Sequence, residues 1–183
     1  MKTLPQPFCL IRYIYSMTAD NTDFDIAVDF IRAVGIPVTF TTLPAGTFLP
    51  GALIQNGELI IDTAKLLYPG DILHEAGHIA VVPAAERGLL HNDNIPQRLQ
   101  REAEEMMAIA WSYAACIYLD IDPYFVFHEN GYKGGGKELA DNFNAGQYFG
   151  VPMLQFAGMS AEPGLSARLQ LPAFPNMAKW LRD

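Results

Sequence analysis

The stretch from Gly70 to Pro83, GDILHEAGHIAVVP, places His74 and His78 four residues apart. Residues at this spacing lie one turn apart on the same face of a helix, so both imidazoles can bind one zinc ion. Glu75 lies about 100° further around the helix, where its carboxylate would reach a metal-bound water rather than the metal. The His-Glu-x-x-His spacing therefore predicts a zinc site with a general base.

The alternative is a buried helix with two histidines in its core. The complete five-residue pattern favours the metal site, because Asp71 is placed to cap this helix directly before it. The apolar residues around the motif predict that the helix is buried: Ile72, Leu73, Ala76, Ile79, Ala80 and Val81.

A catalytic zinc ion usually has three protein ligands and one open position. The metzincin pattern would place a third histidine at position 84, but that residue is Ala84. The next predicted helix instead offers Glu102, Glu104 and Glu105. Glu105 shares a face with Ser112, whereas Glu104 points further away and is expected to be solvated. We predict Glu105 as the third ligand.

Glu102 shares part of the same face and is the next candidate for the third ligand. A simpler interpretation also exists for all three glutamates. Acidic residues in the first turn of a helix are favoured by the helix dipole, without any metal.

The elements that must position these residues follow from periodicity and turn signals. Asn56-Gly57 between two apolar runs predicts a hairpin, because both turn positions need positive φ. The other predicted elements are a helix capped by Asn21 or Thr22 and ending near Val34, a strand over 36–43, a short helical segment over 62–67, and a helix over 97–119 with Pro96 in its first turn.

Length and composition predict one domain over residues 21–183, preceded by an extension over residues 1–20. Translation is expected to start at Met17. A formal charge of −8 argues against nonspecific binding to nucleic acid or anionic membranes, and no apolar run is long enough to cross a membrane. Two cysteines make no disulfide framework, so we expect a cytoplasmic protein with Cys116 buried.

The order of these elements resembles the ImmA/IrrE family of gluzincin-type metallopeptidases over about residues 22–120. The resemblance depends on HEAGH after a small sheet and on EEMMAIAWSYAA in the following helix. His74, Glu75 and His78 match the family motif residue by residue, and Glu105 matches loosely because Met106 follows it where the family often has alanine. The resemblance implies an α+β, zincin-like single domain with a small sheet, the motif helix and a following ligand helix.

The segment GYKGGGK over residues 131–137 fits most of a phosphate-binding loop. Glu138 stands where Ser or Thr would bind magnesium, so nucleotide binding is not expected. His128 and Tyr132 flank the start of this segment and are predicted to stabilise an oxyanion if the loop covers the metal. Tyr113 and Tyr148 are weaker candidates, and ordinary structural roles are the alternative for all four.

These residues together predict a zinc-dependent hydrolase, most simply a metallopeptidase acting on a peptide or protein substrate. Glu75 would take a proton from the water and pass it to the leaving amine. The alternative is a zinc-binding regulatory or interaction protein without turnover. The presence of Glu75 favours the enzyme.

Overall fold

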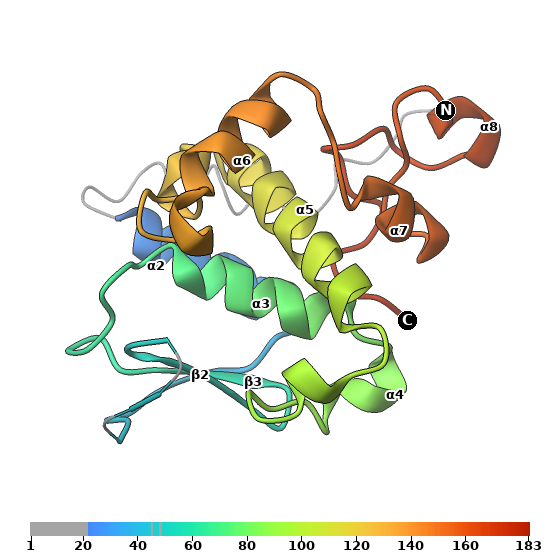
Figure 1. Ribbon diagram of the computed structural model, residues 1–183. Helices are drawn as coiled ribbons and strands as arrows, with labels where there is room; N and C mark the ends of the chain where they lie inside the picture. Colours follow the sequence, from blue (N-terminus) through green and yellow to red (C-terminus); the bar gives the residue numbers. More distant parts are fainter. Residues whose placement is uncertain (1–21, 45, 48) are drawn as a thin grey trace.

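Helix α3 (Asp71–Val81), which carries the histidine motif, is the central element of the fold. The computed structural model describes residues 22–44, 46–47 and 49–183. A small sheet packs against one side of α3, and the long helix α5 (Arg101–Leu119) crosses its other side (Figure 1). The predicted extension over residues 1–20 and the predicted start at Met17 lie outside the described residues.

Helix α2 (Asp23–Ala33) is capped by Thr22, one of the two predicted caps, which forms a capping box with Asp25. The sheet has the order β1-β3-β2: β1 (Val38–Phe40) pairs in parallel with β3 (Glu58–Ile61), and β2 (Ala52–Gln55) pairs antiparallel with β3. The Asn56-Gly57 hairpin is confirmed, with φ values of 53° and 72°. Strand β2 is therefore an edge strand that faces the histidine helix.

All six apolar residues that the sequence places around the motif are fully buried, which confirms the prediction of a buried helix. Gly77 lets α5 approach closely, because a Cβ there would lie 3.0 Å from the carbonyl oxygen of Ala108. Gly70 plays a similar part at the start of α3, where a Cβ would lie 1.8 Å from the carbonyl oxygen of Phe125. The Gly77 contact brings α5 beside the histidines, and the Gly70 contact brings the segment at Phe125 against the start of α3.

Three local predictions were wrong or incomplete. Residues 62–67 form a turn rather than a helical segment, since the Asp62 carboxylate accepts hydrogen bonds from the backbone N–H groups of Leu43 and Ala64. Gly70, not Asp71, is the N-cap of α3, and the Asp71 carboxylate binds another side chain. Pro96 lies in a separate 3-10 helix, η1 (Ile95–Gln97), because Arg98 adopts an extended conformation before α5 begins.

The rest of the chain covers α5 and the C-terminal end of α3. Its helices are α4 (Ala84–Arg87), η2 (Pro123–Phe125), η3 (Tyr132–Gly134), α6 (Gly136–Asn144), α7 (Val151–Phe156) and α8 (Ser166–Leu169). The final residues return to the centre, where the Arg182 N–H donates to the Ala80 carbonyl and Trp180 packs against Trp111. One buried apolar cluster joins these elements, so the described residues form a mixed α+β domain.

Two further sequence expectations concern single features. Cys116 is fully buried, as predicted, and its burial raises the pKa of the thiol to about 12. Within the described part of the chain, every helix is too short or too polar to cross a membrane.

Candidate metal centre

His74 and His78 face the same space on the side of α3 nearest to α5. Their Nε2 atoms lie 3.1 Å apart, and the two rings meet nearly edge to face. Both side chains are largely buried, with 14% and 10% of their surface exposed. The i, i+4 spacing therefore does place two imidazole nitrogens at one point.

Glu105 reaches this point from the first turns of α5. Its Oε1 atom lies 3.6 Å from Nε2 of His74, and its Oε2 atom lies 3.2 Å from Nε2 of His78. Tetrahedral ligands at zinc-like bond lengths stand about 3.3 Å from one another. The three measured separations fall on either side of this value, so the two imidazoles and the carboxylate lie close enough together to share one metal ion.

Glu75 lies beside this set and is almost completely buried, with 4% of its surface exposed. Its carboxylate and the two imidazoles each place one ligand atom within 4.8 Å of the others, so Glu75 is an alternative to Glu105 as the third ligand. We favour Glu105, because each of its oxygens approaches a different ring nitrogen. With Glu105 as the ligand, Glu75 would lie beside the metal ion rather than bind it.

Protonation differs among these groups, because the pKa values of His74 and Glu105 are lowered and those of Glu75 and His78 are raised. Burial, helped by the charge of His78, lowers the pKa of His74 to about 3, so this imidazole is neutral and free to bind a metal. Burial also raises the pKa of Glu75 to about 7, with a smaller contribution from Asp71. Burial tends to raise the pKa of Glu105 too, but its hydrogen bond to His78 and the charges of both histidines outweigh this and lower it.

Tyr132 packs against His74, with the two ring centroids 5.3 Å apart. Its hydroxyl is buried and has no hydrogen-bond partner among the described residues. Burial, together with the charges of Glu105, Asp71 and Glu75, raises the pKa of the phenol well above 10.0, so the hydroxyl keeps its proton. The structure thus brings a free hydrogen-bond donor to the edge of the candidate metal centre.

The backbone around Tyr132 is strained. Tyr132 and Lys133 have φ values of 54° and 58°, in the left-handed region that bulky residues avoid. Holding a residue in this conformation reduces the stability of a protein by on the order of 1–3 kcal/mol, and such residues are concentrated at functional sites. The strain is consistent with a loop whose conformation is maintained to place the phenol.

His128, the other predicted oxyanion donor, is held elsewhere. Its Nε2 atom lies 3.0 Å from Oδ1 of Asp71, and its ring stacks on Tyr68 with centroids 3.9 Å apart. It can therefore affect the site through Asp71, which lies one turn before Glu75 on α3. The sequence offers no signal for this pairing, because Asp71 and His128 are 57 residues apart.

The remaining glutamates of the α5 first turn point away from the histidines. Glu102 is 88% exposed beside Arg101. The prediction that Glu104 is solvated was wrong: it is buried, and both of its oxygens bind Arg98, at 2.6 and 2.8 Å. The break between η1 and α5 turns the Arg98 side chain toward Glu104, which the prediction of one continuous helix did not include.

Other sequence candidates lie away from the centre. The Tyr113 hydroxyl lies 3.1 Å from Oδ1 of Asn144, and Tyr113 and Tyr148 both pack in an aromatic cluster around Phe143. The glycine-rich segment leads into α6, where Lys137 pairs with Asp141 at 2.7 Å. This lysine is therefore engaged within its own helix.

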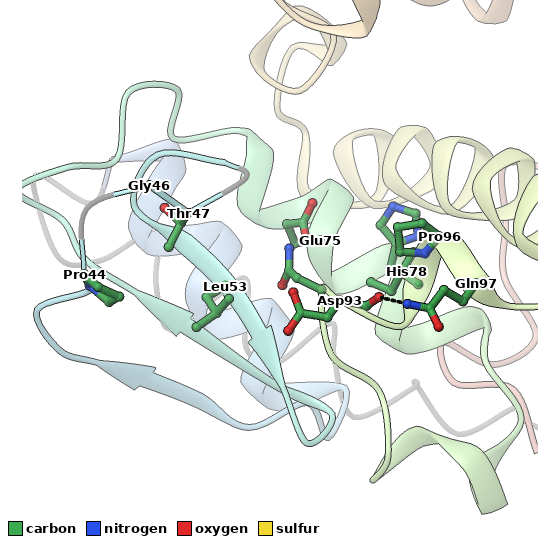
Figure 2. A pocket seen from close by; sticks show the side chains of 11 residues that line it. Pro44, Gly46, Thr47, Leu53, Glu75, His78, Asp93, Pro96 and Gln97 are labelled. Carbon is green, nitrogen blue, oxygen red and sulfur yellow. Dashed lines mark hydrogen bonds between the residues drawn. The ribbon is translucent and has the colours of Figure 1, made fainter.

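A cleft of about 760 Å³ opens beside Glu75 and His78 (Figure 2). Leu53 of β2 and the segment containing Thr47 line one side, and Asp93, Pro96 and Gln97 line another. A substrate in this cleft would lie next to the buried carboxylate of Glu75. No local sequence pattern predicts that Asn92 and Asp93 line this cleft.

Comparisons with protein-family models, with curated proteins and with solved structures gave no match.

Proposed function

We propose that the protein is a zinc-dependent hydrolase of the zincin type, acting on peptide bonds. The observation that carries this proposal is the convergence of His74, His78 and Glu105, at separations of 3.1–3.6 Å, beside the buried carboxylate of Glu75. The order of α2, the sheet, α3 and α5 also agrees with the order in the ImmA/IrrE metallopeptidases that the sequence resembles. The open cleft next to Glu75 supplies room for a substrate.

His74, His78 and Glu105 would hold the metal. A bound zinc ion would polarise a water and lower its pKa toward about 7. Glu75 would take the proton of such a water, and the pKa of about 7 that burial gives its carboxyl in the metal-free site would be lowered by a nearby cation. Glu75 would therefore be ionised as the base and would then donate the proton to the leaving amine.

Tyr132 would stabilise the negative charge that develops on the carbonyl oxygen of the substrate. Its buried hydroxyl retains its proton and has no competing partner among the described residues, so it can donate a hydrogen bond to that oxygen. His128 is assigned a positioning role instead, because its ring is held by Asp71 and Tyr68.

The test is cleavage of a mixed-sequence peptide library by the zinc-loaded protein, followed by mass spectrometry. Glu75→Gln should keep its zinc, since Glu75 is not a ligand, and lose activity by about 10²–10⁴-fold. Chelation should abolish cleavage and added zinc should restore it. Undiminished cleavage by zinc-loaded Glu75→Gln, or no cleavage by the zinc-loaded native protein, would contradict the proposal.

A further inference from the structure

The edge of β2 that faces the cleft is already paired. The Ile54 N–H donates to the side-chain oxygen of Asn92, and the Asn92 N–H donates to the Ile54 carbonyl at 3.2 Å. At the start of the strand, the Ala52 N–H donates to the Leu49 carbonyl at 3.4 Å. An extended peptide adds to an edge strand through such free backbone groups. The cleft must therefore gain much of its selectivity from side chains of the substrate.

The neighbouring residue, Asp93, places a charge where it can do this. Figure 2 shows its carboxylate pointing into the space between Leu53 and Glu75. Its backbone is held in place, because the Gln97 side chain donates to the Asp93 carbonyl at 3.0 Å. Among the described residues, no ion pair or hydrogen bond occupies the Asp93 carboxylate itself.

The rest of the lining suits a long cationic side chain. No lysine or arginine lines the cleft in the described part of the chain, so no cation of the protein competes for Asp93 there. Leu53, Ile95 and Pro96 supply apolar surface. Lysine and arginine side chains pack an apolar stem along such surface and extend their charge to a polar partner.

We propose that the cleft recognises a basic side chain of the substrate, lysine or arginine, which Asp93 binds through its carboxylate. This inference deepens the proposed function, because it names the substrate class of the same site. It makes Asp93 a specificity residue that does not take part in the chemistry.

The experiment measures binding separately from turnover. Zinc-loaded Glu75→Gln protein, which should bind without cleaving, is immobilised and exposed to a library of acetylated and amidated hexapeptides at about 0.15 M salt. Mass spectrometry of the retained peptides should give an enrichment of lysine and arginine of about fivefold, the upper range for an exposed ion pair. Adding Asp93→Asn should remove the enrichment. Adding Glu138→Gln, which removes an exposed charge on α6 outside the cleft, should preserve it.

Retention without a basic preference, an equal preference after Asp93→Asn, or no retained peptide would overturn the inference. The native protein, incubated with the same library, tests the proposed function on its own. Basic peptides that are retained but never cleaved would refute the peptidase and leave the binding assignment standing. Cleavage without a preference for basic residues would support the peptidase and refute the assignment of Asp93.

Discussion

Glu104 and Glu105 are neighbours in sequence, yet the structure assigns them separable tasks. Glu104 is 7% exposed and binds Arg98 through both oxygens, whereas Glu105 is 44% exposed and, among the described residues, forms its ion pairs with the two histidines. Alanine at position 104 should therefore reduce the free energy of unfolding, and alanine at position 105 should reduce zinc affinity. Each variant is the matched control of the other.

The expected cost of Glu104→Ala follows from its partner. Breaking a buried ion pair costs about 3–5 kcal/mol when the remaining charge is uncompensated. Arg98 would still pair with Glu86 at 2.7 Å, which reduces this cost. Because Glu86 is 53% exposed, it compensates the Arg98 charge only in part, and we expect the free energy of unfolding to fall by about 2–3 kcal/mol. For a chain of this size, this corresponds to a fall in Tm of roughly 5–10 °C. Zinc affinity should change less than about threefold, the range expected for a residue without contact to the ligands.

Glu105→Ala should have the opposite profile. Glu105 is an ion-pair partner of His78, but the imidazole can release its proton when the carboxylate is removed, so the Tm of the metal-free protein should change by less than about 2 °C. Zinc affinity should fall at least about tenfold, since even the loss of groups that only support metal ligands has this effect. Thermal melting of the metal-free proteins and competition with a chromophoric chelator measure the two quantities. Weaker zinc binding in Glu104→Ala but not in Glu105→Ala would refute the ligand assignment.

Three other perturbations follow from the same contacts. Gly77→Val should force α3 and α5 apart, which should lower the free energy of unfolding by about 2–3 kcal/mol in chemical denaturation and weaken zinc binding. An unchanged zinc affinity would show that the close approach of Ala108 does not position the ligands. Asn92→Ala leaves the Ile54 N–H without its partner and should cost about 1–2 kcal/mol, whereas Asn94→Ala, which loses only links within its own loop, should cost less. Equal losses would contradict the role of the β2 edge. In Glu75→Gln protein, zinc affinity should fall about tenfold per unit decrease in pH below the pKa of His78, because the metal must displace one proton. In the native protein burial lowers that pKa, but the hydrogen bond to Glu105 and the charges of Glu75 and other carboxylates outweigh burial and raise it, so the loss of Glu75 should move this pH dependence to lower pH. His74, with a pKa of about 3, should add no second proton near neutral pH, so a slope of two would contradict this arrangement.

The features that local sequence patterns predict are the ones built from contacts close in the chain. The hairpin at Asn56-Gly57 depends on two adjacent residues with positive φ, and the histidine pair depends on one helical turn. The choice of Glu105 over Glu104 followed from helical periodicity, because Glu105 and Ser112 share the face that contacts α3. Periodicity alone could assign that face.

The remaining features depend on contacts between distant segments. Periodicity could not reveal that Arg98 would fold back on Glu104, since that contact requires the helix to be interrupted after Pro96. His128 and Tyr132 were equivalent in sequence, and only the left-handed backbone at Tyr132 and the Asp71 contact distinguish them. The cleft depends on Asn92 reaching Ile54, 38 residues away, for which no local signal exists.

The metal content of protein purified without added metal tests the central claim most directly. Elemental analysis should find about one zinc ion per chain, the content of a site built from three protein ligands. The same measurement on His74→Ala protein that remains folded should find almost none. Native protein that contains no zinc and does not bind it when titrated, or a His74→Ala variant that retains a full equivalent, would contradict the assignment of His74, His78 and Glu105 as a metal centre.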